Sequence, residues 1–363
     1  MNKGIIHFMG LFGGLGGTER ATLEEMLMMR ECGFDVVYTC ITPMQGFKEV
    51  LMENNIPWKS CDYKSPLDLM AFWKLWKRLK DIKSVRVILI AHNVFAMICI
   101  LLQGKRNTSF MRHHYHHFGI GTISPFKWLI TYVVSAISIR NIAYVCDYIR
   151  QEAIRILPLL KNKSCVIHNI FQMESPVCIY DMMRVRASLG IAEHAFVIGG
   201  AGRFETVKRW DIWVNVLTLV LERDMNSVAL VVGGGSQSAL ITKLVEQFPG
   251  RVIFPGLKQN MGDFYTALDV LLFISDFDST PRVPMEALSF GKPAVVSLSK
   301  GGLGEIFPKN IMPYFEKHNL TQIVDAVLKM RGYKINREDI MAHLEKYSMT
   351  SIRKEYLSWL KLA

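Results

Sequence analysis

Two cations follow an apolar stretch in the second half of the sequence, in a segment that opens with glycine. The strand-like residues 196–201 lead into Gly202, Arg203 comes next, and Lys208 stands five positions further on. Open α/β sheets bind ligands beyond the carboxyl ends of their strands, which is where this segment would lie. A guanidinium can hold phosphate oxygens as a fork and an ammonium can add a point charge, so the pair could bind one diphosphate. Two solvated surface cations would show the same spacing, and position alone does not separate the two interpretations.

Two carboxylates form a second candidate site. Asp278 precedes Glu286 by eight residues, and Glu286 is expected to open an apolar helix after a loop that contains two prolines. A carboxylate in the first turn of a helix is favourable by itself, so Glu286 could be a simple helix-start residue. The functional alternative is a bidentate acceptor for sugar or ribose hydroxyls.

Glycines also cluster near the N-terminus, directly after the first strand-like run. Residues 13–17 contain four glycines and precede a helix-like segment. Gly16 and Gly17 would let backbone N–H groups approach a ligand at the positive end of that helix. The spacing is wrong for a dinucleotide-binding loop, and Cys40, Ile41 and Thr42 stand where such a fold needs an acid. A tight strand–helix turn would use the same glycines.

Four histidines fall within residues 113–117: His113, His114, His116 and His117. Such a run resembles a metal cluster. Neither Cys nor a carboxylate accompanies the histidines, however, so we predict no metal site there.

These candidate residues stand in a chain whose strand-like and helix-like segments alternate from end to end. Several strand-like runs are continuous blocks of Val, Ile and Leu, which is typical of parallel sheets covered on both faces. The pattern loosens near residue 172 and then restarts. We therefore predict an α/β protein with an N-terminal domain at 1–171, a second domain at 172–344, and a C-terminal helix at 345–363 that packs back toward the first domain.

Several segments, taken in order, resemble the GT-B retaining glycosyltransferases of family 4, the group 1 glycosyltransferases. The resemblance covers nearly the whole chain. The segments are Gly16-Gly17-Thr18-Glu19-Arg20, Val166-Ile167-His168-Asn169, Gly202-Arg203 with Lys208, Gly233-Gly234-Gly235, Gly256 with Tyr265 and Asp269, Asp278 with Glu286-Ala287 and Gly291-Lys292-Pro293, and Gly301-Gly302 with Glu305. The resemblance implies two Rossmann-like α/β/α domains whose parallel sheets face each other across a cleft.

The resemblance also implies roles for particular residues. The catalytic set would be His113, Arg203, Lys208 and Asp278, with His114 as the alternative to His113 beside the donor sugar. Arg203 and Lys208 would hold the donor diphosphate, and Glu286 would accept from the ribose. The remaining donor-binding residues would be Gly16, Gly17, Gly233, Leu257, Gly301 and Gly302. No metal and no cofactor would be needed, because the sugar nucleotide is a substrate.

The sequence departs from the family pattern at three positions. Asp278 stands where the family has glutamate, Ser279 replaces a glycine, and Ile170 follows Asn169 where a glycine is usual. The first two changes bear on the donor sugar and leave the diphosphate site untouched. Asp276 and Asp278 also form an Asp-x-Asp pair of the kind that holds a metal in GT-A transferases. We prefer the metal-free site, in which cationic side chains and helix N-termini stabilise the phosphates.

The net charge of +11 is concentrated in the first half of the chain. Residues 1–170 contain 21 Lys and Arg against 12 Asp and Glu, a net charge of +9. No nucleic-acid-binding signature accompanies this charge, so we favour an anionic membrane surface as the partner. A helix-like stretch at 66–83 would provide the contact, with basic residues beside an apolar stripe. The stripe would contain Leu69, Phe72, Trp73, Trp76 and Leu79. An ordinary core-packed helix with a solvated basic face is the alternative.

The cysteines and the apolar runs bear on location. The seven cysteines include no Cys-x-x-Cys pair, which is typical of reduced thiols in a cytoplasmic protein. The uncharged run 87–104 contains His92, Asn93 and Gln103, so we predict a strand, a loop and a helix and no membrane span. The start of the sequence has no signal-peptide pattern. We expect a cytoplasmic protein that can lie on the inner face of the cytoplasmic membrane.

Taken together, the sequence predicts a metal-independent retaining glycosyltransferase. It would move a sugar from a UDP-, GDP- or ADP-linked donor to a saccharide or lipid-linked acceptor, in cell-envelope polysaccharide or lipopolysaccharide synthesis. Two alternatives remain: a UDP-sugar 2-epimerase on the same fold, and a non-catalytic nucleotide-binding partner of a transferase. A nicotinamide-dependent oxidoreductase is disfavoured by the missing acid after the second strand.

Overall fold

The computed structural model describes residues 3–11, 16–63, 68–81, 84–90, 93–114, 125–173, 179–257, 261–297, 299–307, 314–315 and 319–362. The chain divides into two compact units. Unit 1 contains Met1–Ile170 and Met349–Ala363, and unit 2 contains Phe171–Ser348. The chain thus enters unit 2 one residue before the boundary expected from the sequence, and returns to unit 1 at Met349 instead of 345.

Unit 1 is built on a parallel sheet of seven strands in the order β3-β2-β1-β4-β5-β6-β7. The order reverses direction at β1, as in doubly wound α/β folds. The strands are β1 (Ile5–Gly10), β2 (Asp35–Cys40), β3 (Trp58–Ser60), β4 (Ser84–Ile90), β5 (Ser109–His113), β6 (Asn141–Tyr144) and β7 (Ser164–Val166).

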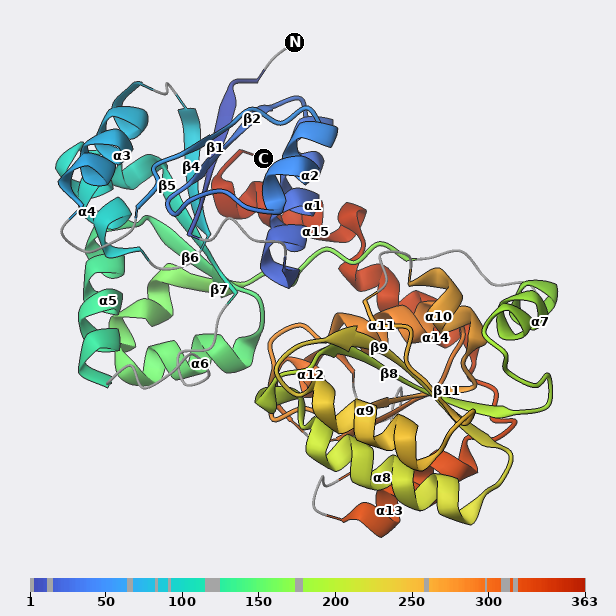
Figure 1. Ribbon diagram of the computed structural model, residues 1–363. Coiled ribbons are helices and arrows are strands. Elements are labelled where there is room, and N and C mark those ends of the chain that lie inside the picture. The colour runs from blue at the N-terminus through green and yellow to red at the C-terminus, as the bar shows by residue number, and fades with distance from the viewer. Residues whose placement is uncertain are drawn as a thin grey trace. The chain divides into compact units, whose positions relative to one another are not determined.

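Helices cover both faces of this sheet (Figure 1). On one face lie α1 (Gly17–Glu31), α2 (Phe47–Glu53) and α15 (Met349–Leu360), and on the other lie α3 (Leu69–Asp81), α4 (Val94–Leu102), α5 (Pro125–Ser138) and α6 (Asp147–Ile156). The run at 87–104 is therefore the end of β4, a connection and α4, as the sequence predicted. Among the described residues, no helix is both long and apolar enough to cross a membrane.

A buried polar cluster ties the C-terminal helix into unit 1. Arg112 on β5 donates to Glu25 Oε1 of α1 at 2.6 Å, and the Tyr356 hydroxyl of α15 donates to Glu25 Oε2 at 2.8 Å. All three side chains are almost completely buried. Arg112 also donates to the carbonyl of Ile167 at 2.6 Å, so the ion pair is well supplied with hydrogen bonds. This cluster joins residues from both ends of the chain.

Unit 2 has a parallel sheet of six strands in the order β10-β9-β8-β11-β13-β15. Its strands are β8 (Phe196–Arg203), β9 (Ser227–Gly234), β10 (Val252–Ile253), β11 (Val270–Phe273), β13 (Ala294–Ser297) and β15 (Tyr314–Phe315). A separate pair, β12 (Phe277–Asp278) and β14 (Lys300–Gly301), lies outside this sheet. The two parallel α/β units confirm the predicted fold class.

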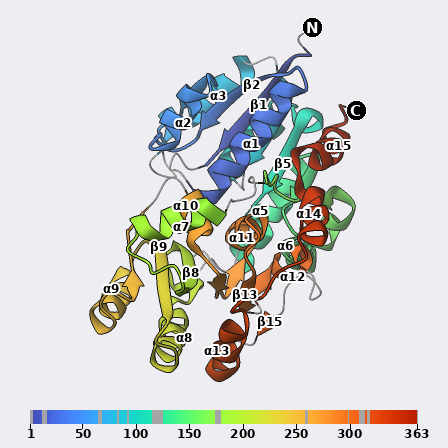
Figure 2. The ribbon, with the colours of Figure 1, turned by 90° about the vertical axis from the view of Figure 1, so that its right-hand side faces the viewer.

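The unit 2 sheet is also covered on both faces (Figure 2). On one side lie α8 (Trp210–Arg223), α9 (Ser238–Gln247) and α13 (Leu320–Lys329), and on the other lie α7 (Ile179–Ser188), α10 (Gly262–Ala267), α11 (Arg282–Ser289) and α14 (Arg337–Leu344). The short α12 (Leu303–Ile306) follows β14. Because alternate residues of a strand face opposite sides, neighbours such as Val197 and Ile198 enter two different apolar clusters. This explains the unbroken apolar runs in the sequence.

The apolar stripe predicted for residues 66–83 is partly wrong. Helix α3 buries Ala71, Leu75 and Leu79, whereas Leu69 and Trp73 are exposed. The buried positions follow an i, i+4, i+8 row, so the helix is rotated relative to the predicted stripe. Helix α3 thus packs in unit 1 like an ordinary helix and still presents an aromatic side chain to solvent.

Candidate functional site

The carboxyl ends of β8 and β9 form a glycine-lined edge in unit 2. Gly202 pairs with Gly233, and Arg203 with Gly234. Gly233 has φ +151°, and a Cβ at that position would come within 2.0 Å of the Gly202 carbonyl oxygen. A residue with a side chain would clash there, so the sequence needs glycine for two backbones to lie this close. The result is a close approach of two main chains at the edge where parallel sheets bind ligands.

Arg203 ends β8 and projects its side chain into solvent. The side chain is 76% exposed, and its guanidinium lies 2.8 Å from the carboxylate of Glu205. The backbone of Arg203 is held more firmly than its side chain, because the Arg203 carbonyl accepts a hydrogen bond from the Trp210 indole at 3.0 Å. Arg203 therefore has an anchored main chain and a guanidinium that is open to an anion.

Lys208 follows in a short 3-10 turn, Thr206–Lys208. Its Nζ lies 2.5 Å from Asp278 Oδ2 and 5.1 Å from the centroid of the Phe273 ring. The ammonium is 20% exposed and the carboxylate 15% exposed, so this ion pair is largely shielded from water. Two of the predicted catalytic residues, 70 positions apart in the chain, thus meet in space.

Backbone hydrogen bonds hold this meeting in place. The Val207 carbonyl accepts from the Asp276 backbone N–H at 2.8 Å and from the Ser275 hydroxyl at 3.1 Å. These contacts attach the turn after β8 to the segment that follows β11. The sequence did not predict that Val207 contacts Ser275 and Asp276, because the contact depends on two loops that follow different strands.

Asp278 is positioned by the small β12–β14 pair. It lies opposite Gly301, and its carbonyl accepts from the Gly302 N–H at 2.8 Å. Gly301 has φ +106°, and a Cβ there would lie 2.2 Å from the Asp278 carbonyl oxygen. Asp278 Oδ1 also accepts from the Thr280 N–H at 3.1 Å. The predicted donor residues Asp278, Gly301 and Gly302 are therefore brought together.

Glu286 does not open its helix, which corrects the expectation from the sequence. Helix α11 begins at Arg282, so Glu286 lies in the second turn and gains little from the helix N-terminus. Its Oε2 accepts from the Tyr265 hydroxyl at 2.5 Å, and Oε1 lies 3.8 Å from Arg282 Nε. Burial and the nearby Glu286 carboxylate raise the pKa of Tyr265 well above its usual value, so the phenol stays protonated and donates.

Leu257 borders the glycine-lined edge. It is 81% exposed, and its side chain lies 3.5 Å from the position a Cβ would occupy on Gly234. The Gly256 carbonyl accepts from the Gly233 N–H at 3.1 Å. Gly233 and Leu257, both predicted as donor-binding residues, therefore lie at the same edge.

The two residues of the Asp-x-Asp pair face different cations. Asp276 lies 3.5 Å from Arg209, whereas Asp278 binds Lys208. Arg209 has φ +44° and also pairs with Asp211 at 2.7 Å. Within the described part of the chain, no group of three or more His, Cys, Asp or Glu side chains has an arrangement that could hold a metal ion.

The candidate residues of unit 1 lie at two strand ends. Gly16 caps α1, and its N–H donates to Glu19 Oε2 at 3.0 Å, while a Cβ on Gly17 would meet open space. His113 ends β5, is buried, and packs edge-on against Tyr144 with ring centroids 5.1 Å apart. Residues 13–15, His116 and His117 lie outside the described residues.

His114 is buried beside His113 at the end of β5. Its pKa is well below the usual value, first because of burial and then because of the Arg112 charge. The imidazole is therefore neutral at neutral pH.

The family model described as "Glycosyl transferases group 1" matches residues 195–331, which include every candidate site residue of unit 2. Solved structures match over almost all of the chain. A structure of Anabaena Alr3699/HepE in complex with UDP is 17% identical, with a TM-score of 0.81, and the match covers 99% of this chain and 100% of that chain. A glycosyltransferase from Rickettsia africae is 15% identical, with a TM-score of 0.81 and coverage of 98% and 97%. The fold is GT-B.

Curated relatives of this GT-B protein match over shorter stretches. The "Uncharacterized glycosyltransferase MJ1607" of Methanocaldococcus jannaschii is 26% identical, and the match covers 62% of this chain and 64% of the relative. The N-acetyl-α-D-glucosaminyl L-malate synthase of Bacillus anthracis is 23% identical, with coverage of 49% and 46%. The chain thus spans less than two thirds of either relative. The group 1 match and the GT-B fold support the glycosyltransferase superfamily.

Proposed function

We propose that this chain is a retaining, family 4 glycosyltransferase that moves a sugar from a nucleotide-diphosphate donor to a saccharide or lipid-linked acceptor without a metal. The donor binds unit 2 and the acceptor binds unit 1. The contact between Lys208 and Asp278, 2.5 Å apart beside Gly301, is the observation that carries the proposal. This contact supports the proposal because it brings a cation for the diphosphate next to a carboxylate that can bind the sugar, at the edge where parallel sheets bind ligands.

The cations supply the stabilisation that departure of a nucleoside diphosphate requires. Negative charge grows on the diphosphate as the glycosidic bond breaks, and positioned cations lower the energy of that state. Arg203 is exposed and can fork onto phosphate oxygens, and Lys208 adds a shielded charge. Losing one such donor typically slows transfer by about 10²–10³-fold.

The neighbouring residues hold the rest of the donor. Glu286 accepts ribose hydroxyls through its carboxylate, and the Tyr265 hydroxyl keeps that carboxylate in position. Gly233 and Leu257 border the nucleotide, while Asp278 and Gly302 contact the sugar. UDP is the nucleotide we favour, because the similar Anabaena structure is a complex with UDP.

The names of similar proteins support an envelope acceptor. They include a "Vi polysaccharide biosynthesis protein" of Salmonella typhi, 28% identical over 141 residues, and a "lipopolysaccharide outer core galactosyltransferase WaaB" structure with a TM-score of 0.68. We therefore place the reaction in the synthesis of cell-envelope polysaccharide or lipopolysaccharide, on the cytoplasmic side of the membrane.

A thermal-shift panel of UDP-, GDP- and ADP-sugars tests the proposal. A true donor at 100 times its Kd stabilises the protein by about 2.7 kcal/mol. We expect a UDP-sugar to raise the melting temperature and Arg203→Ala to abolish that rise. If no sugar nucleotide raises the melting temperature, the proposal fails. Isomerisation of the donor without an acceptor would identify an epimerase instead, and an inverted anomeric configuration in the product would refute the retaining mechanism.

The structure suggests a membrane-facing surface other than the predicted one at 66–83. Helix α5 exposes five large apolar side chains at helical spacing: Phe126, Leu129, Ile130, Val133 and Ile137. Such a stripe on a helix suits insertion into the boundary between headgroups and acyl chains. The charge of +9 on residues 1–170 would add attraction to anionic lipids. We therefore assign peripheral membrane contact to α5.

Co-sedimentation with phosphatidylglycerol vesicles tests this assignment. Ile130→Asp with Val133→Asp should lower the fraction of bound protein severalfold, because charge on the inserted face opposes burial in lipid. Met52→Asp is the matched control, since Met52 is an exposed apolar residue on α2 of the same unit. Equal binding of the α5 variant and the control would refute the assignment.

A further inference from the structure

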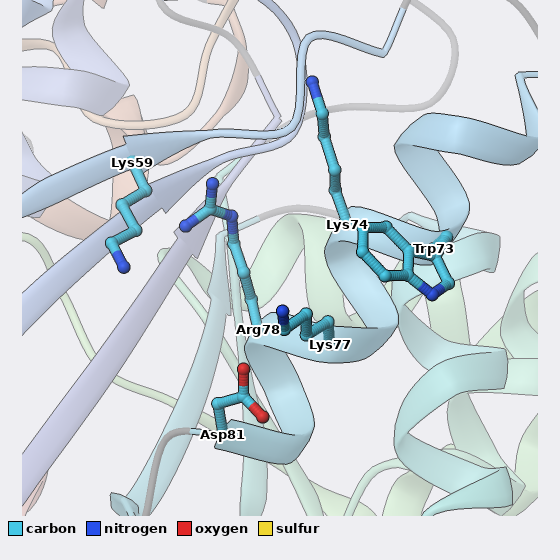
Figure 3. A pocket seen from close by; sticks show the side chains of 6 residues that line it. All are labelled: Lys59, Trp73, Lys74, Lys77, Arg78 and Asp81. Carbon is cyan, nitrogen blue, oxygen red and sulfur yellow. The ribbon is translucent and has the colours of Figure 1, made fainter.

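A hollow with basic walls lies between β3 and α3 in unit 1 (Figure 3). Its volume is about 390 Å³. The residues that line it are Lys59, Trp73, Lys74, Lys77, Arg78 and Asp81. Four side chains are thus cationic and one is acidic, with one aromatic ring. None of these residues has a part in the donor site of unit 2.

The four cations differ in the direction of their side chains and in their partners. Figure 3 shows Lys59 and Arg78 reaching toward the same space from β3 and α3, while the Lys74 side chain points away from them. Lys74 has a carboxylate partner, since its Nζ lies 3.3 Å from Asp62. Lys77 Nζ lies 5.4 Å from the centroid of the Trp73 ring. Lys59, Lys77 and Arg78 therefore line the hollow without the Asp62 partner that Lys74 has, and an indole lies beside Lys77.

These three cations are poorly neutralised. Within the described residues, neither Lys59 nor Lys77 has a carboxylate within ion-pair distance, whereas other surface cations such as Arg223 do. Arg78 donates from Nη2 to the Ser60 carbonyl at 3.3 Å, and its Nε is buried without a hydrogen-bond partner in the described structure. A concave site with surplus positive charge and an unused guanidinium donor attracts an anion.

The neighbouring surface indicates that the ligand is elongated. A second hollow of about 500 Å³ lies at the carboxyl end of β3 and shares Lys74 with the first. Between Met70 in one hollow and Asp81 in the other, α3 rises about 16 Å. This length exceeds a single sugar ring, so the two adjoining hollows suit a chain of sugars better than a small ion. Asp62 and Asp68 line the second hollow, so an anionic group of the ligand belongs in the first hollow and an uncharged part in the second.

We propose that the hollow between β3 and α3 binds an acidic saccharide, with its phosphate or carboxylate on Lys59, Lys77 and Arg78 and a sugar ring against the Trp73 indole. An indole offers a flat apolar surface for the C–H face of a sugar, and the cations select the charged group. This inference rests on the proposed function, because the ligand would be a remote part of the acceptor chain. Unit 1 would thus recognise a polyanionic glycan away from its reacting end.

Direct binding to the full chain tests this proposal without a donor. Fluorescence anisotropy would follow labelled oligogalacturonate, which carries carboxylates, and labelled poly(glycerol phosphate), which carries phosphates. We expect at least one to bind, and a neutral cello-oligosaccharide of equal length to bind at least tenfold more weakly. Lys59→Gln with Lys77→Gln should weaken the acidic ligand about tenfold and flatten its salt dependence. Trp73→Ala should weaken it severalfold at every salt concentration.

Lys80→Gln is the matched control, because Lys80 is an exposed cation on α3 that does not line the hollow. If Lys80→Gln weakens binding by at least half as much, in free energy, as Lys59→Gln with Lys77→Gln, the attraction is non-specific and the proposal is overturned. The proposal also fails if neither acidic ligand binds. A lipid headgroup phosphate is the other source of an anion, so the same variants are sedimented with phosphatidylglycerol vesicles. Loss of vesicle binding with unchanged saccharide binding would make the site a lipid site.

The experiments distinguish failure of the proposed acidic-saccharide site from failure of the proposed transferase activity. Donor binding is read from melting temperatures with sugar nucleotides and needs no saccharide. A protein that is stabilised by a UDP-sugar but binds no acidic glycan would be a transferase with a neutral acceptor. A protein that binds acidic glycan but no sugar nucleotide would keep the site in unit 1 and lose its proposed activity.

Discussion

Lys208 Nζ and Asp278 Oδ2 lie 2.5 Å apart in unit 2, and both side chains are largely shielded from water. The ion pair joins a residue that follows β8 to the first residue of the family's glutamate motif, which is one methylene shorter in this chain. An incoming diphosphate must share Lys208 with this carboxylate. In the donor site that we propose, Lys208 would attract the leaving group and Asp278 would repel it.

Replacing Asp278 should therefore separate nucleotide binding from catalysis. Asp278→Asn removes a negative charge next to the diphosphate site, so UDP should bind about three- to tenfold more tightly, or about 1 kcal/mol. Transfer should slow, because the carboxylate no longer orients the donor sugar. Calorimetry with UDP and initial-rate kinetics measure the two effects. Asp325→Asn, which breaks an exposed ion pair with Arg223 elsewhere in unit 2, should change neither. Weaker UDP binding in Asp278→Asn would contradict this account.

Lys208 itself should be essential to turnover. Lys208→Ala removes a shielded cation from the leaving group and should lower kcat by about 10²–10³-fold. The stabilisation by UDP-sugar should also diminish. Lys243→Ala, an exposed lysine on α9, is the control and should behave like the wild type. Retention of more than half of the activity in Lys208→Ala would show that the ion pair has only a structural role.

Gly301 should tolerate no side chain. Its φ of +106° is unfavourable for other residues, and an added Cβ would lie 2.2 Å from the Asp278 carbonyl oxygen. Gly301→Ala should displace the β12–β14 pair, lower the unfolding free energy by about 1–3 kcal/mol and reduce activity. Gly304→Ala is a matched control three residues away, because a Cβ there would meet open space in α12. Equal melting temperatures for the two variants would refute the steric argument.

The stability of unit 1 should depend on the buried Tyr356 hydroxyl of the C-terminal helix. Tyr356→Phe removes the donor to Glu25 at 2.8 Å and leaves a buried carboxylate oxygen without that hydrogen bond. We expect a loss of about 1–3 kcal/mol in the unfolding free energy of unit 1, measured by urea denaturation. Tyr333→Phe alters an exposed tyrosine in unit 2 and should have no measurable effect. A destabilisation of equal size in both variants would count against the buried cluster.

Acid should destabilise unit 1 in part through His7. Burial, followed by the charges of Lys105 and Arg78, lowers the pKa of His7 from 6.5 to about 3. The neutral form is required in the fold, so stability is complete above pH 6.5 and falls as the pH drops toward 3, by up to about 1.4 kcal/mol per pH unit. His7→Gln should flatten the dependence of melting temperature on pH over this range. His194→Gln alters an exposed histidine and should leave the dependence unchanged; an unchanged slope in His7→Gln would reject this assignment.

The sequence by itself determined the α/β architecture, and it is the basis on which we predict where the donor site lies along the chain. Blocks such as 196–201 and 270–273 are typical of strands buried on both faces, since their apolar residues are consecutive. Parallel strands place their following segments at one edge, which is why we predict Arg203 and Lys208 as ligand-binding residues. The glycines at 202 and 233 can also be read from the sequence. Both have a positive φ that side chains disfavour, and at 233 an added Cβ would also clash with the Gly202 carbonyl.

Only the tertiary structure decided which of these residues meet. The contact of Lys208 with Asp278 spans 70 positions and depends on how two loops pack, which no local pattern encodes. The same reason explains why α3 turned out rotated from its predicted stripe, and why the apolar face of α5 remained uncovered. Amphipathic spacing specifies that a helix has an apolar side, whereas the neighbouring elements decide which side is buried.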